Sequence, residues 1–155
     1  MKLKYFSNGI ILMFCFLLIS SSSSNAQSGH LGVRGGYYTD AEEVFLGGEF
    51  LTQLAPRIYL NPNVEYIFVD NATFLTFNGD LHFDFPTAGR NYFWVGGGFA
   101  LAFFDPEGNR DSETDAGLNL LFGAGFPTGS VIPYVQAKII LSESEDFVIG
   151  FGLRF

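Results

Sequence analysis

The sequence predicts an all-β protein, an up-and-down antiparallel eight-stranded transmembrane β-barrel, on the basis of three observations. Apolar and polar residues alternate with a period of two along most of the chain, as in strands whose two faces meet different surroundings. The 155 residues include 19 Phe and 19 Gly with a positive mean hydropathy, a composition that is unusual for a water-soluble domain. No apolar run after the N-terminal segment approaches the roughly 20 residues of a membrane-spanning helix.

The N-terminus predicts an export signal. Lys2 and Lys4 precede a short apolar run, and a small-x-small cleavage sequence ends at Ala26. The run is too short for a spanning helix, and a serine tract follows it where a stop-transfer segment would carry charges. We therefore expect residues 1–26 to be a cleaved Sec signal peptide and residues 27–155 to be one barrel domain.

The cysteine content and the charge further restrict the class of protein to which this chain can belong. Cys15 is the sole cysteine and lies within the apolar run, which continues past it, so we expect no lipid anchor there. The exported domain must then be stable without disulfides. Two of the 8 basic residues fall in the predicted signal peptide, and the 16 acidic residues outnumber the basic residues that remain. This excess of negative charge argues against nucleic acid as a partner.

The alternation breaks at turn residues and divides the exported part into strands. We expect strands at residues 29–38, 43–54, 57–68, 73–84, 91–104, 116–125, 131–141 and 147–155. Most of them reach the roughly 9 to 11 residues that a tilted strand needs to cross a bilayer.

The connections between these strands are of two kinds. Tight, proline-containing connections are expected near residues 55–56, 86–89 and 126–130, and longer, acidic ones at residues 39–42, 69–72, 105–115 and 142–146. Short turns on one side and long loops on the other are typical of outer-membrane barrels, in which the short side is periplasmic. An even number of strands places both chain ends on that side.

The two rows of each strand indicate which face meets lipid. Within residues 58–68 one row is wholly apolar, whereas the other consists of Tyr, Asn, Asn, Glu and Ile. A soluble lipocalin-like barrel also alternates, but its water-facing row would be rich in Lys and Glu. Here the polar row is rich in Asn and Gly, which suits a narrow interior filled by side chains. We therefore expect the apolar rows to face lipid.

The polar rows also carry isolated charges, which we expect to form a packed ionic network in the lumen. Buried charges are tolerated when they are paired and hydrogen-bonded. Because the first and last strands become neighbours on closure, we expect Arg34 and Arg154 to share carboxylates from Glu49 or Glu65. The alternative is that these groups line an ion path. The predicted network comprises Arg34, Glu49, Glu65, Asp80, His82, Lys138 and Arg154, with Asp84 as a further carboxylate.

Aromatic residues gather at the strand ends and are candidates for the aromatic girdles of membrane interfaces. On the loop side these are Phe68, Phe74, Phe103 and Phe104, and on the tight-turn side Phe83, Phe85, Tyr92, Phe93, Trp94, Phe126 and Phe155.

With these features the chain resembles the small eight-stranded outer-membrane proteins of the OmpA-barrel and OmpX type. The most specific element is the end of the chain, where Phe151, Leu153 and Phe155 form a C-terminal assembly signal like that of the terminal strand in such proteins. The resemblance implies the outer membrane of a Gram-negative bacterium. It also implies lipid and lipopolysaccharide as surroundings, and the barrel assembly machinery and periplasmic chaperones as partners during biogenesis.

The sequence offers little catalytic chemistry. His30 and His82 are the candidates for acid–base chemistry, and the serines of the exported part fall at the amino end or in connections. We therefore expect neither a catalytic site nor a cofactor. Residues 105–115 carry oxygen ligands at alternate positions, but Arg110 stands where a calcium loop requires glycine. The weak calcium candidates are Asp105, Glu107, Asn109 and Asp111.

The predicted function is that of an integral outer-membrane protein with a structural or interaction role, either in envelope integrity or in presenting surface loops. A narrow porin-like pore for small solutes is the principal alternative. A soluble lipocalin-like ligand-binding barrel and a lipid A-modifying enzyme are further alternatives.

Overall fold

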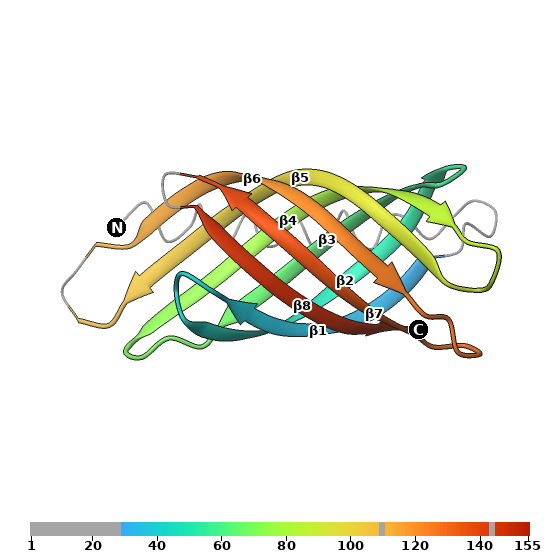
Figure 1. Cartoon of the computed structure of the whole chain (residues 1–155). Helices are drawn as coiled ribbons and strands as arrows, with labels where there is room; N and C mark the ends of the chain where they lie inside the picture. Colours follow the sequence, from blue (N-terminus) through green and yellow to red (C-terminus); the bar gives the residue numbers. More distant parts are fainter. Residues whose placement is uncertain (1–28, 109–110, 143–144) are drawn as a thin grey trace.

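The computed structural model describes residues 29–108, 111–142 and 145–155, so the predicted signal peptide lies outside the described residues. The described chain forms eight strands in one closed antiparallel barrel, in which each strand pairs with its sequence neighbours and the last pairs with the first (Figure 1). The strands are β1 (Gly29–Tyr38), β2 (Glu43–Ala55), β3 (Ile58–Ile67), β4 (Ala72–Pro86), β5 (Tyr92–Pro106), β6 (Glu113–Gly125), β7 (Ile132–Leu141) and β8 (Asp146–Arg154). The predicted fold class is therefore confirmed.

The closure of the barrel brings the start of β1 and the end of β8 to one end of the molecule. The Phe155 N–H donates to the Leu31 carbonyl at 2.8 Å, and the His30 ring lies 3.3 Å from the Phe155 carbonyl. We call this the turn end, because it also carries the connections at residues 56–57, 87–91 and 126–131. The opposite end, with connections at residues 39–42, 68–71, 107–112 and 142–145, is called the loop end.

The prediction of short turns at one end of the barrel and longer loops at the other is wrong. The connections at residues 39–42 and 68–71 are shorter than the turn-end connection at residues 126–131. The largest error concerns residues 105–115, where β5 continues to Pro106 and β6 already begins at Glu113. Backbone pairing extends past the last apolar residues there, since Asp105 is in register with Thr73 and Glu113 with Phe104.

The outer face of the barrel is a continuous apolar belt. Leu31, Leu46 and Phe99 are 66%, 60% and 71% exposed, and the outward row of β8 repeats this with Phe151 at 62%. In water these contiguous side chains would carry a large unfavourable free energy, so the surface fits hydrocarbon. Among the described residues, no helix has the length and hydropathy needed to cross a membrane.

The inner face is polar in the middle and aromatic toward both ends. Near the loop end Tyr38, Phe45 and Ile67 are buried together. Near the turn end Trp94 is fully buried and its ring contacts Tyr92 and Tyr134. Trp94 and Tyr92 were expected in the membrane-interface girdle, and this expectation is wrong, because their positions on β5 belong to the inward row.

Candidate functional site in the charged lumen

Five neighbouring strands bring charged side chains to the centre of the lumen. Arg34 comes from β1, Glu49 from β2, Glu65 from β3, Lys138 from β7 and Arg154 from β8. Each residue occupies an inward position of its strand, because side chains of a strand alternate between the two faces. All five are buried, with at most 5% of each residue exposed.

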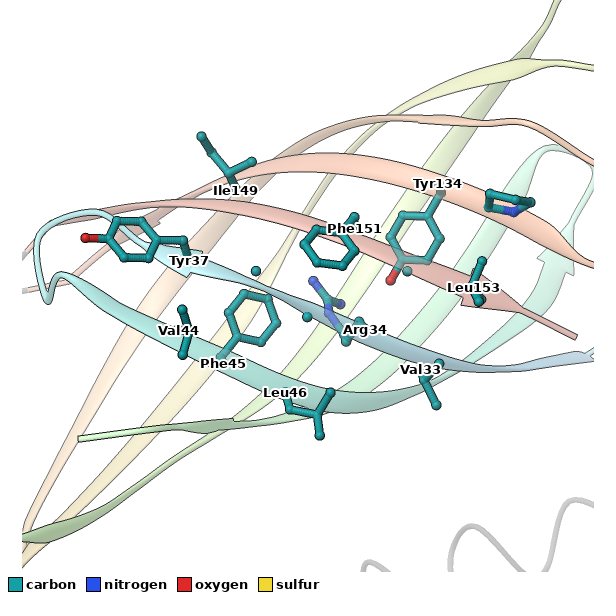
Figure 2. A pocket seen from close by; sticks show the side chains of 14 residues that line it. Val33, Arg34, Tyr37, Val44, Phe45, Leu46, Tyr134, Ile149, Phe151 and Leu153 are labelled. Carbon is teal, nitrogen blue, oxygen red and sulfur yellow. The ribbon is translucent and has the colours of Figure 1, made fainter. Parts of the chain in front are cut away.

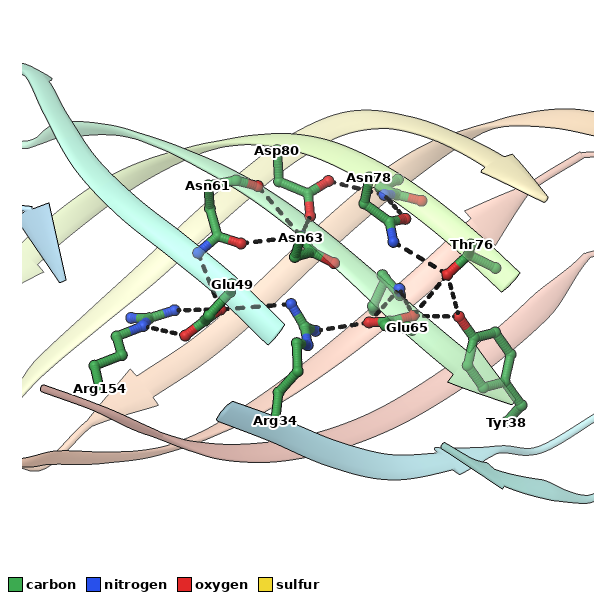
Figure 3. A network of polar contacts seen from close by, with 12 residues as sticks. Arg34, Tyr38, Glu49, Asn61, Asn63, Glu65, Thr76, Asn78, Asp80 and Arg154 are labelled. Atoms are coloured by element: carbon green, nitrogen blue, oxygen red, sulfur yellow. Dashed lines mark hydrogen bonds and ion pairs between the residues drawn. The ribbon is translucent and has the colours of Figure 1, made fainter. Parts of the chain in front are cut away.

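Glu49 is the carboxylate nearer the turn end (Figure 3). Its Oε1 accepts a hydrogen bond from Arg154 Nε at 2.7 Å, and its Oε2 lies 3.6 Å from Arg34 Nη1. Asn61 Nδ2 donates to the same Oε2 at 3.0 Å. Glu49 therefore joins the last strand to the first and is itself held by an amide from β3.

Glu65 is the second carboxylate and lies toward the loop end. Lys138 Nζ contacts both of its oxygens, at 3.1 and 2.8 Å, and Arg34 Nη2 lies 3.1 Å from Oε1. The Tyr38 hydroxyl also donates to Glu65, as does Thr76 Oγ1 at 3.1 Å. Through Arg34, the two carboxylates belong to one continuous chain of ion pairs that runs from Arg154 to Lys138.

Amide side chains occupy the other side of the lumen, on β3, β4 and β6. Asp80 accepts hydrogen bonds from Asn63 at 3.0 Å and from Asn119 at 2.8 Å. Asn119 also donates to Asn78, which in turn donates to Thr76 and so reaches the Glu65 cluster. Asp80 thus belongs to the network through amides, and no Lys or Arg among the described residues lies within ion-pair distance of it.

Small residues on β5 provide the space for this packing. A Cβ atom at Gly98 would lie 2.4 Å from Asp80 Oδ1 and 2.3 Å from the Gly79 carbonyl oxygen, closer than real Cβ contacts. The three described lumen cations and the carboxylates Glu49, Glu65 and Asp80 are also equal in number, so their formal charges balance. Burial of this many ionic groups is possible because each has a partner of opposite charge or an amide.

His82, like Asp80, is a member of the predicted network that takes no part in the ion pairs among the described residues. It is buried with its ring stacked on Trp94 at a centroid distance of 5.6 Å. Its Nε2 has no hydrogen-bond partner in the described part of the chain. Arg154 lies over the same tryptophan ring and over the Tyr134 ring, at 5.0 and 4.2 Å from their centroids.

Several members of this network were not predicted from the sequence. Their positions on the inward rows could have indicated them. Neutral polar side chains on those rows were expected only to fill the lumen, not to hydrogen-bond with the charged groups. They are Tyr38, Asn61, Asn63, Thr76, Asn78, Asn119 and Tyr134.

A further set of buried polar atoms has no hydrogen-bond partner among the described residues. It includes Arg34 Nε, Trp94 Nε1, the Tyr134 hydroxyl and Gln136 Oε1. Buried polar groups in proteins are nearly always hydrogen-bonded, to protein or to ordered water. These atoms are therefore the positions in the lumen with capacity to bind water.

The other predicted sites are dispersed. Asp105 lies at the end of β5, Glu107 and Asp111 are exposed, and Asn109 lies outside the described residues. No group of three acidic, histidine or cysteine side chains in the described chain is placed to hold a metal ion. Neither histidine has a serine hydrogen-bond partner among the contacts of the described part.

The outward row of β8 forms one wall of an apolar groove on the lipid-facing surface. The groove has a volume of about 810 Å³ and runs along the seam between β1 and β8 (Figure 2). Val33, Leu46 and Phe151 flank it, and Gly35 leaves it open because no side chain covers the backbone there. Two of the three residues of the predicted assembly signal, Phe151 and Leu153, line this groove.

An apolar belt around a closed antiparallel barrel with an ionic lumen defines a transmembrane β-barrel of the outer-membrane type. Neither a protein-family model nor a curated protein matches the chain. Solved structures of small outer-membrane barrels do share its fold.

The N-terminal β-barrel domain of OprF from Pseudomonas aeruginosa superposes with a TM-score of 0.71 at 15% identity, covering 82% of this chain and 95% of that one. Neisserial surface protein A gives 0.69 at 12% identity, with 84% and 98% covered. A de novo designed transmembrane β-barrel gives 0.56 at 16% identity, with 85% and 98% covered. The similarity extends to a designed barrel, so at these identities it concerns the fold and does not identify a role.

Proposed function

We propose that this protein is a structural component of the Gram-negative outer membrane, a non-conducting barrel whose lumen is closed by its own side chains. The observation that supports this proposal is the chain of ion pairs from Arg154 through Glu49, Arg34 and Glu65 to Lys138. This chain of ion pairs lies across the lumen, and each of its five side chains is at most 2% exposed.

Opening a path through this layer would require separating buried ion pairs. Leaving a buried charge without its partner costs about 3–5 kcal/mol, and several pairs here share partners. An open state would therefore be sparsely populated at equilibrium. A barrel of eight strands is also just wide enough for its own side chains to fill.

The short connections favour a role in the membrane over a role in adhesion. The loop-end connections at residues 39–42 and 68–71 offer little surface for a protein partner. Their acidic character suits contact with the lipopolysaccharide layer through divalent cations. For biogenesis we propose the barrel assembly machinery and periplasmic chaperones as partners, with the outward β8 row as the recognised element.

Conductance of the purified protein in planar lipid bilayers tests the proposal. The wild-type protein should give no stepwise currents, and Glu65→Ala should give currents if the ion pairs are what closes the lumen. Heat-modifiable migration on gels must be the same for both proteins, which controls for misfolding. Frequent, reproducible wild-type channels would contradict the proposal.

A narrow pore for small solutes is the second candidate function. The observation that favours it is the set of buried polar atoms to which the described residues offer no hydrogen-bond partner, a set that includes atoms of Arg34, Trp94 and Tyr134. Wild-type channels that show ion selectivity, and that change their conductance in Tyr134→Phe, would favour this candidate.

A further inference from the structure

The turn end of the lumen opens into a vestibule of about 470 Å³ that is lined by both polar and apolar residues. Its walls are the last inward-facing residues of the strands, among them His30, Tyr59, Asp84 and Tyr92, and its rim includes Arg57 and Arg90 from two different turns. The volume lies within the range of small-molecule sites, roughly 300–1,000 Å³.

Arg57 and Arg90 differ from the other basic residues that the structure describes. Arg34, Lys138 and Arg154 each have a carboxylate within ion-pair distance. No carboxylate in the described chain lies that close to Arg57 or Arg90. In a protein with 16 acidic residues, these two guanidinium groups are therefore available to an external anion.

The backbone at Arg57 is unusual for an arginine. Its φ is 66°, in the left-handed region that glycine or asparagine adopts readily in a tight turn. Its carbonyl accepts a hydrogen bond from the Asp84 N–H at 2.9 Å, which fixes the turn against β4. A residue other than glycine that is held at such a backbone φ is a reason to look for a function at that position.

The remaining walls give the vestibule mixed chemistry. Tyr59 and Tyr92 supply aromatic surface, and the Asp84 carboxylate, which is partly buried, is the acidic side chain lining this space. The Tyr92 hydroxyl accepts a hydrogen bond from Arg154 Nη1 at 3.4 Å, so the floor of the vestibule is the buried end of the ionic network.

The distribution of charge along the barrel axis favours an anion at this end. The connections at the loop end carry acidic residues, whereas Arg57 and Arg90, the described arginines without a carboxylate partner, lie at the turn end. The loop end would repel an anion, and the field of the arginines would attract one to the turn end.

We propose that the vestibule binds an anionic group, a phosphate or a carboxylate, through Arg57 and Arg90, on a ligand that presents a hydrogen-bond donor to Asp84. Arginine binds both anions with charge-assisted hydrogen bonds, which are stronger than neutral ones. The two sources of such a group are a soluble periplasmic molecule and the headgroup of a phospholipid. The proposal does not depend on whether the lumen conducts.

The test is a titration of the whole barrel in phosphatidylcholine nanodiscs, followed by NMR of the arginine Nε–H groups. The soluble probes are inorganic phosphate, O-phosphoethanolamine and citrate. A second series replaces part of the phosphatidylcholine with phosphatidylglycerol. Saturable shifts of Arg57 and Arg90 with a soluble probe assign a soluble ligand, and shifts only with phosphatidylglycerol assign a lipid headgroup. No saturable shift in either series overturns the proposal.

Variants separate binding from folding. Arg57→Gly combined with Arg90→Gln should weaken binding at least about tenfold, the size expected for loss of charged hydrogen bonds. Glycine adopts the φ of this turn freely, so the variant should fold as well as the wild type, as heat-modifiable migration will show. Asp84→Asn should weaken O-phosphoethanolamine more than inorganic phosphate.

The control is Arg110→Gln, which removes one positive charge at a sequence position between β5 and β6 that does not belong to the vestibule lining. Its binding should equal that of the wild type. Equal weakening in this control and in the double variant would show a nonspecific charge effect and would overturn the assignment of the vestibule.

Discussion

Glu49 and Arg154 form their ion pair beside a residue that has no side chain. Gly32 on β1 is in register with Glu49 on one neighbouring strand and with Arg154 on the other. The Arg154 Nε to Glu49 Oε1 distance is 2.7 Å, and a Cβ atom at Gly32 would lie 2.8 Å from both Cγ and Oε1 of Glu49. The pair thus links the second strand to the last across the first, in space that only glycine leaves free.

Gly32→Ala should destabilise the barrel. The added methyl group must displace the Glu49 side chain from Arg154, and overpacking of this kind costs about 1–3 kcal/mol. The free energy of unfolding in urea, measured in liposomes, gives the value. Gly79→Ala is the control, because a Cβ atom there meets nothing within 4 Å. Equal losses in the two variants would contradict the explanation.

Glu65 and Lys138 should show strong energetic coupling. Glu65→Leu alone leaves the Lys138 ammonium without its carboxylate, which should cost about 3–5 kcal/mol. Adding Lys138→Met replaces the charged pair with an apolar one, so the double variant should be more stable than the sum of the single effects predicts. Contacting residues typically couple by about 0.5–3 kcal/mol in such a cycle. Additive effects in the unfolding measurement would indicate that the pair makes no specific contribution.

An arginine on the outer face should be costly in proportion to its depth. Leu120 is 51% exposed near the middle of β6, and Leu31 is 66% exposed near the turn end of β1. Leu120→Arg should cost about 2–4 kcal/mol and Leu31→Arg about 0–1 kcal/mol, as expected at the midplane and the interface of a bilayer. Unfolding from liposomes measures both values. If both substitutions were harmless, the outer face would not be in contact with hydrocarbon.

Phe155 should matter more for assembly than for stability. Its side chain is 56% exposed on the outer face, so Phe155→Ala removes few contacts from the folded barrel. If the β8 row is the element that the assembly machinery recognises, folding into proteoliposomes that contain this machinery should slow. Spontaneous folding into detergent should proceed at the wild-type rate. Slowing to the same extent in both assays would point to a general folding defect.

Removal of divalent cations tests the role of the acidic loop end. In membranes that contain lipopolysaccharide, a chelator should lower the thermal stability of the barrel, because cations no longer bridge its carboxylates to lipid phosphates. In phosphatidylcholine, which lacks those extra phosphate groups, the chelator should have no effect. Unchanged stability in both membranes would exclude the bridging role.

The strands and their two faces could be predicted because both depend on local sequence. A period of two places Arg34, Glu49 and Glu65 on one face of their strands wherever those strands lie, and glycine on the same face predicts a narrow interior. Where pairing depends on backbone hydrogen bonds rather than on apolar residues, the same reasoning failed. Asp105 and Glu113 were assigned to a long loop for this reason, although they belong to paired strands.

The amino-acid sequence alone determined the number of strands, their alternating faces and the set of charges that must be buried. The tertiary structure alone decided which charge meets which. Arg34 contacts carboxylates on both β2 and β3, whereas His82 stacks on Trp94 and takes no part in the ion pairs. The physical reason is the stagger between strands in a closed barrel, which sets the height of each side chain in the lumen and is a property of all eight strands together.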